Sequence, residues 1–166
     1  MDRERLIMRA SEEQYGEKFR DHCLEIYKIY VGTADKISER RQTANSFFLS
    51  INTAIVGLVS YLQAGSNEKT FLGFYLLVST AGMLICYIWY RLILSYKQIN
   101  SGKFKVIHQI EEQLPLSPYN AEWEMLGRGE DPKKYLPFTH IEILVPWVFL
   151  GLHAVLFIKS ILYLNR

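Results

Sequence analysis

Three long apolar stretches constrain this chain more than any other feature. They cover residues 47–64, 71–90 and 141–164 and carry almost no charge. A helix that crosses the hydrocarbon core of a bilayer needs ~20 mostly apolar residues, and each stretch meets that requirement. We therefore predict an all-α integral membrane protein with three transmembrane helices. The pattern excludes an ordinary soluble domain, a disordered chain and a secreted disulfide scaffold.

The charged residues lie around these stretches and define the other segments. After the second stretch, apolar positions keep a helical spacing until Pro115, so that span should continue as a helix outside the membrane. The predicted segments are an amphipathic cytoplasmic helical region at 1–46, a first span at 47–64, a second span at 71–94 with a cytoplasmic extension at 95–114, an irregular cap at 115–139 with a short helix at 121–126, and a third span at 141–164.

The distribution of basic residues predicts the orientation in the membrane. Nine Lys and Arg residues lie in 1–46 and seven in 91–140, but only one lies in the short hairpin at 65–70. Positively charged segments are retained on the cytoplasmic side. We therefore expect the N-terminus and the 95–139 region inside, and the hairpin and the C-terminus outside.

The first span carries a stripe of small residues. Successive members follow one another at +4 or +3, a helical spacing, and they are Ser46, Ser50, Thr53, Gly57, Ser60 and Ala64. In lipid, such stripes allow helix backbones to approach closely. Three alternatives remain open: packing against another span of the same subunit, an interface between subunits, or the lining of a polar pore. A second, shorter run of small residues in the second span comprises Ser79, Gly82 and Cys86.

Three polar side chains interrupt the apolar spans: Asn52, Gln63 and His153. An ionisable residue inside a membrane is a functional candidate by default, so His153 could serve a proton or ion pathway. The interpretation we favour is a neutral imidazole that is hydrogen-bonded to a polar side chain of a neighbouring span. For Asn52 and Gln63 we likewise expect hydrogen bonds between helices rather than ion coordination.

The N-terminal region predicts an amphipathic helix that packs on the extension of the second span. Its apolar stripe has the spacing of a coiled-coil seam and consists of Tyr15, Phe19, His22, Ile26 and Ile29. Residues 31–33 suggest a turn, after which a second helix would begin near Ala34 and enter the membrane.

Arg40 and Arg41 precede the first span directly. In a ring of subunits they would concentrate positive charge at the inner mouth, which favours anions or phospholipid headgroups. The alternative that we favour is pairing with Glu39, Glu111 or Glu112, or with lipid phosphate, each of which contributes little at an exposed site.

The sequence offers no convincing catalytic or metal-binding motif. His140 and Glu142 form H-x-E, but the P-C-x-x-C that completes the zinc-deaminase signature is missing. Adjacent residues on a helix diverge, so Asp21, His22 and Cys23 cannot form a relay. We predict no enzyme activity, no catalytic residues and no cofactor. The net charge of +2 gives no reason to expect nucleic acid as a partner.

Three motifs resemble the RipA-family octameric membrane proteins of bacteria. They are ADKISERRQTANSFFLSINTA at 34–54, CYIWYRLILSYKQINSGKFKVIHQIEEQLP at 86–115 and YLPFTHIEILVPWVF at 135–149. The resemblance implies a ring-forming homo-octamer in the bacterial inner membrane, and the orientation inferred from the basic residues would then make its C-terminus periplasmic. Its partners would be its own copies and the phospholipid bilayer, and its role would lie in envelope or stress physiology.

The N-terminal half is also similar to the two-span SLATT effectors, which are thought to perforate membranes. The third span and the 97–139 region depart from that pattern. We therefore predict a non-enzymatic octameric membrane assembly, with a pore-forming effector as the first alternative and a membrane-embedded enzyme as the second.

Overall fold

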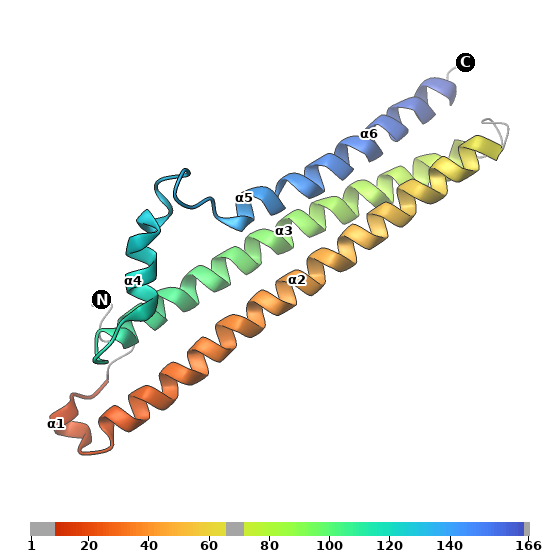
Figure 1. Cartoon of the computed structure of the whole chain (residues 1–166). Coiled ribbons are helices and arrows are strands. Elements are labelled where there is room, and N and C mark those ends of the chain that lie inside the picture. Colours follow the sequence, from red (N-terminus) through yellow and green to blue (C-terminus); the bar gives the residue numbers. More distant parts are fainter. Residues whose placement is uncertain (1–8, 66–71, 165–166) are drawn as a thin grey trace. The chain divides into compact units, whose positions relative to one another are not determined.

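The computed structural model describes residues 9–65 and 72–164, and every regular element within them is helical (Figure 1). The elements, in chain order, are α1 (Glu12–Tyr15), α2 (Phe19–Gly65), α3 (Leu72–Glu111), α4 (Pro118–Met125), the 3-10 helix η3 (Gly127–Gly129), α5 (Phe138–Glu142) and α6 (Leu144–Leu164). Three helical segments are long and apolar enough to cross a membrane: α2, α3 and α5–α6. The predicted all-α class with three spanning helices is confirmed.

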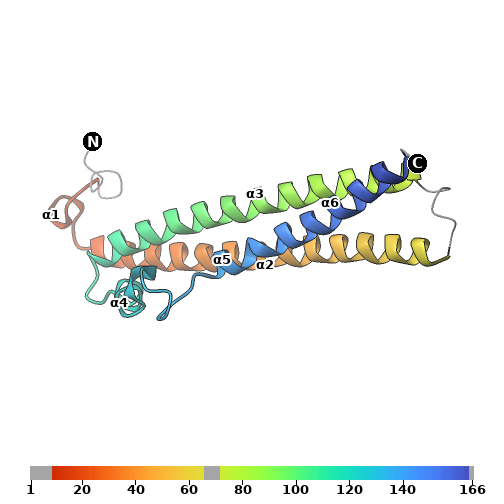
Figure 2. The ribbon, with the colours of Figure 1, turned by 90° about the horizontal axis from the view of Figure 1, so that it is seen from above.

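The described residues form two compact units, and α2 and α3 contribute to both. The polar unit contains residues 9–40 and 96–137, and the apolar unit contains 41–65, 72–95 and 138–164. Within each unit the α2 and α3 segments run antiparallel, side by side (Figures 1 and 2). A third element completes each unit, because α4 packs on the pair in the polar unit and α6 packs on the pair in the apolar unit.

The turn expected at 31–33 does not occur, since α2 is one unbroken helix. A glycine inside a helix costs only ~1 kcal/mol relative to alanine, so Gly32 is tolerated. Thr33 satisfies its hydroxyl within the helix by donating to the carbonyl oxygen of Tyr30 at 2.8 Å. The second helix expected from Ala34 is therefore the continuation of α2.

The contact stripe expected in the N-terminal region is displaced by one residue. Phe19 is buried, but Ile26 and Ile29 are 49% and 61% exposed. Tyr27 faces α3 instead, where its hydroxyl donates to the carboxylate of Glu111 at 3.0 Å. Both faces of this helix carry apolar side chains at +3 and +4 spacing, so the tertiary partner decides which face is covered.

The third spanning segment contains a break that the expected single helix lacked. α5 ends at Glu142, α6 begins at Leu144, and Pro146 lies in the first turn of α6. Proline has no N–H to donate to the carbonyl of Glu142, and its ring clashes with that carbonyl in a continuous helix. The break at Ile143 follows from this, while the proline itself is tolerated at the start of α6.

Candidate functional site

A buried hydrogen-bond network joins the three helices of the apolar unit. Asn52 on α2 and His153 on α6 are 0% and 1% exposed, and Nε2 of His153 lies 3.1 Å from Oδ1 of Asn52. Cys86 on α3 donates its thiol to the same oxygen at 3.2 Å. The amide nitrogen of Asn52 donates to the carbonyl oxygen of Phe48 at 2.8 Å. Because Oδ1 can only accept, this pattern assigns a proton to Nε2 of His153.

The imidazole of His153 rests directly on Gly82 of α3. A Cβ atom built at Gly82 would lie 2.5 Å from both ring nitrogens, so only glycine leaves room for the ring. Ser79 and Cys86, on the same face of α3, are fully buried. The small run of the second span is therefore an internal packing surface of the subunit.

The three polar residues that interrupt the spans have different environments in the structure. Asn52 and His153 are hydrogen-bonded to each other across two helices, which matches the interpretation favoured for them. Gln63 is exposed near the end of α2. Cys86, which completes the network, was noted only as a small residue, because a thiol donor has no distinctive sequence pattern.

A second polar cluster lies where α2, α3 and α5 meet in the apolar unit. Asn45 donates to Oε1 of Glu142 at 3.2 Å and accepts from the indole N–H of Trp89 at 2.9 Å. Trp89 is 2% exposed and stacks on Phe48 with ring centroids 5.8 Å apart. These contacts fix the start of the third spanning segment against the first two.

The two arginines expected at an inner mouth have different environments. The Nε of Arg41 lies 3.7 Å from Oε1 of Glu142, and its side chain is only 20% exposed. Arg40 is exposed. Arg41 therefore has an acidic neighbour, Glu142, that was not among the partners expected from the sequence.

The small stripe of the first span is exposed along its whole length. All six residues, from Ser46 to Ala64, face away from the helices that pack on α2. Within the described part of the chain, no atom lies within 4 Å of a Cβ built at Gly57. Packing of this stripe inside the subunit, one of the three alternatives, is not seen among residues 9–65 and 72–164.

The polar unit contains a buried carboxylate that sequence reasoning missed. Glu111 is 1% exposed, and it accepts hydrogen bonds from the backbone N–H groups of Tyr119 and Asn120 at 3.0 and 2.9 Å. It thus caps the first turn of α4 from the last residue of α3, the preceding helix. Burial, reinforced by the hydrogen bond to Glu111, raises the pKa of Tyr27 to about 12. The cap also explains why α4 begins at Pro118 rather than at Ala121, where the short helix was predicted from the sequence to start.

The residues considered for catalysis are dispersed. His22 is hydrogen-bonded to the hydroxyl of Tyr15 at 2.8 Å, and His140 is exposed while Glu142 belongs to the cluster with Asn45. Among residues 9–65 and 72–164, no group of three or more His, Cys, Asp or Glu side chains could hold a metal ion.

Comparison with known families completes this description. The model of the octameric membrane protein family (8xMP) matches residues 24–162, which is most of the chain. Comparisons with curated proteins and with solved structures gave no match. The matched region covers most of both units and includes the buried hydrogen-bond network of Asn52, Cys86 and His153 and the exposed stripe of α2. The chain belongs to the octameric membrane protein family.

Proposed function

We propose that this chain forms a non-enzymatic homo-octameric scaffold in a bacterial inner membrane, and that its subunits meet along the exposed stripe of α2. The exposure of this stripe is the observation that carries the proposal. Small residues in a membrane helix permit close backbone contact with a protein neighbour, and no described element of the same subunit packs on them.

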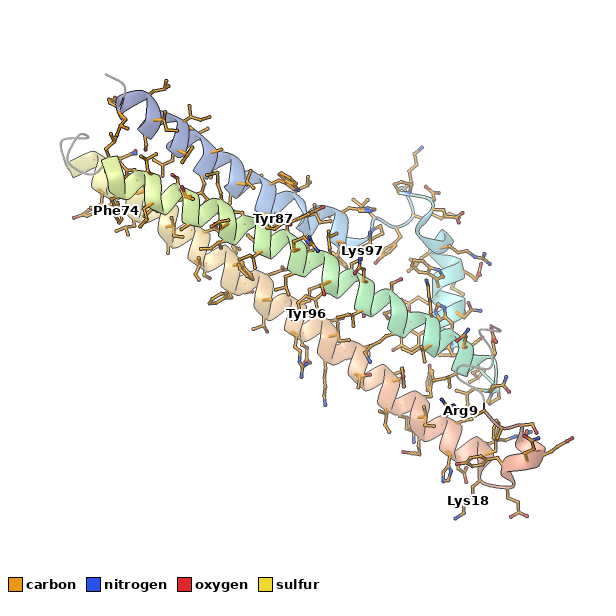
Figure 3. The ribbon with its side chains drawn as sticks, turned by 180° about the vertical axis from the view of Figure 1, so that it is seen from behind. Arg9, Lys18, Phe74, Tyr87, Tyr96 and Lys97 are labelled. Carbon is orange, nitrogen blue, oxygen red and sulfur yellow. The ribbon has the colours of Figure 1, made fainter. Side chains whose placement is uncertain are left out.

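The other exposed faces of the spanning helices have a different composition. α6 exposes bulky side chains, among them Val148, Val155 and Leu162, and α3 exposes Phe74 and Tyr87 (Figure 3). Bulky apolar surfaces suit lipid chains as well as protein. The α2 stripe is the surface that gains most from a second helix, because a neighbouring backbone can approach it closely.

The hydroxyl groups of the stripe are compatible with a dry contact. Ser60 donates to the carbonyl oxygen of Val56 at 2.8 Å, so its hydrogen-bonding requirement is met within α2. A neighbouring subunit can therefore cover this residue without leaving an unsatisfied donor in the membrane.

The basic residues support the orientation that goes with this proposal. The polar unit carries most of the positive charge of the chain and would lie in the cytoplasm. The C-terminal end of α6 would then lie on the periplasmic side. A role in envelope or stress physiology is supported by the resemblance to the RipA family.

A pore is the second candidate, and one observation favours it. Continued toward the N-terminus at the same spacing, the stripe passes through Gln42, Glu39 and Asp35, all exposed. No large apolar side chain interrupts it, and a continuous polar face of this kind suits the wall of an aqueous path.

Two measurements test the proposal and separate it from the pore. Native mass spectrometry in mild detergent should give the mass of eight subunits, and a monomer would contradict the proposal. Cysteines placed at Ser50 and Thr53 should resist small water-soluble thiol reagents if the stripe packs against a neighbour. Rapid modification of both within an intact octamer would instead support the pore.

A further inference from the structure

Among the residues that the structure describes, α4 covers one flank of the polar unit and no element covers the other. The ring of Tyr119 on α4 lies 6.5 Å from that of Tyr27 and 5.6 Å from that of Phe104, measured between centroids. On the other flank, Lys103 donates to the hydroxyl of Thr33 at 3.0 Å. An α-helix has 3.6 residues per turn, so Thr33 lies roughly 100° or more around α2 from Tyr27, and Lys103 lies at least as far around α3 from Phe104.

The open flank carries exposed apolar side chains. Ile29 and Ile26 precede Thr33 by four and seven positions, and Ile99 precedes Lys103 by four, so all three lie on the flank of that hydrogen bond. Their exposed fractions are 61%, 49% and 48% for Ile29, Ile26 and Ile99. Exposed apolar side chains gathered on one flank mark an interaction surface.

Basic side chains extend the same flank along α2. Lys36 and Arg40 follow Thr33 by three and seven positions, and both are exposed. We define the open flank as Ile26, Ile29, Lys36, Arg40 and Ile99. It combines an apolar section with a positively charged section.

A complementary surface lies on the covered side of the polar unit. We call residues 116–125, which contain α4, the α4 segment. Leu116 and Met125, at its two ends, are 77% and 79% exposed. Glu122, three positions before Met125 on α4, and Glu130, directly after η3, are exposed and supply negative charge. A ring of identical subunits needs two different, complementary surfaces on each copy, and these two flanks provide such a pair.

We propose that the open flank docks onto the α4 segment of a second copy of this chain. The proposal rests on the octameric assembly proposed above and adds a second contact, outside the membrane. The isoleucines pack against Leu116 and Met125 of the neighbouring copy, while Lys36 and Arg40 face its acidic side chains. Each polar unit is then closed on both flanks by its neighbours.

Cross-linking in the assembled protein tests this contact. In a background with Cys23→Ser and Cys86→Ser, the variant carrying Ile29→Cys and Met125→Cys is treated with a short bismaleimide. Because the contact joins two different surfaces, it should give a ladder of covalent species that continues beyond the dimer. The matched control replaces Ile29→Cys by Lys28→Cys, which is exposed on another face of α2 and should give no ladder.

A second variant tests the energetic contribution of the contact. Ile29→Asp should shift the octamer-to-subunit midpoint by about tenfold or more in protein concentration, whereas Lys28→Asp should leave it unchanged. An intact octamer that gives no ladder with Ile29→Cys and Met125→Cys, and that tolerates Ile29→Asp, would overturn the proposal. That result would leave the contact through the α2 stripe standing, and a wild-type monomer would instead refute the proposed function.

Discussion

Gly82→Ala tests the close packing of the intramembrane network. The added methyl group would lie 2.5 Å from Nδ1 and Nε2 of His153, far inside van der Waals contact. The imidazole would have to move away from α3. That movement would stretch or break the 3.1 Å hydrogen bond to Asn52.

The expected cost follows from three contributions. Inserting one methyl group into a packed core costs ~1–3 kcal/mol. Losing a hydrogen bond between membrane helices costs about 0.6 kcal/mol on average. The higher helix propensity of alanine returns up to ~1 kcal/mol. We therefore expect Gly82→Ala to lower the free energy of unfolding by about 1–3 kcal/mol. Gly151→Ala is the matched control, since a Cβ at Gly151 meets no atom within 4 Å in the described structure.

Unfolding of the purified protein by a denaturing detergent, followed by circular dichroism, measures this difference. A double-mutant cycle identifies its cause, because in a His153→Ala background the added methyl group meets no imidazole. Gly82→Ala should then cost little or become stabilising. Equal stability of Gly82→Ala and Gly151→Ala, or an unchanged cost in the His153→Ala background, would refute the proposed packing.

Three further results are expected. Glu111→Gln should destabilise α4 by ~1–3 kcal/mol, because a charged cap is lost, and hydrogen exchange should show faster exchange of the Tyr119 and Asn120 amides; unchanged rates would contradict the cap. Burial and Glu111 raise the pKa of Tyr27 to about 12, so the folded polar unit retains a proton that the unfolded chain releases near pH 10. The stabilisation should be intact below pH 10 and fall as the pH rises toward 12. Tyr27→Phe should weaken this pH dependence when unfolding is followed across that range. A cysteine at Ser117 should be protected from an impermeant maleimide in whole cells and one at Ser66, which lies outside the described residues, should be labelled; the opposite pattern would reverse the orientation.

The spanning helices could be predicted from the sequence because their signal is local. About 20 apolar residues in succession suffice to identify a spanning helix, whatever it packs against. The hydrogen bond of His153 was also foreseeable in kind, since a buried imidazole needs a polar partner. Its identity as Asn52 required the structure, because the two residues lie 101 positions apart.

The features that were missed depend on tertiary contacts. Tyr27 rather than Ile26 faces α3 because Glu111 accepts its hydroxyl, and helical spacing alone fits both faces equally. Arg41 lies beside Glu142, which follows two intervening spans in the sequence, and nothing local to Arg41 indicates this contact. The small stripe illustrates the same limit, since its spacing is evident in the sequence but only the structure reveals that the described elements leave it exposed.

The proposed assembly along the α2 stripe is tested most directly by the oligomeric mass of Gly57→Leu, compared with Gly151→Leu. Both glycines are exposed, and a Cβ at either position meets no atom within 4 Å in the described structure, so each subunit should fold with either leucine. If the stripe packs against a neighbouring helix, a leucine at Gly57 forces the two apart. Native mass spectrometry should then show Gly151→Leu as an octamer and Gly57→Leu as smaller species. An intact octamer for Gly57→Leu would contradict assembly through this stripe.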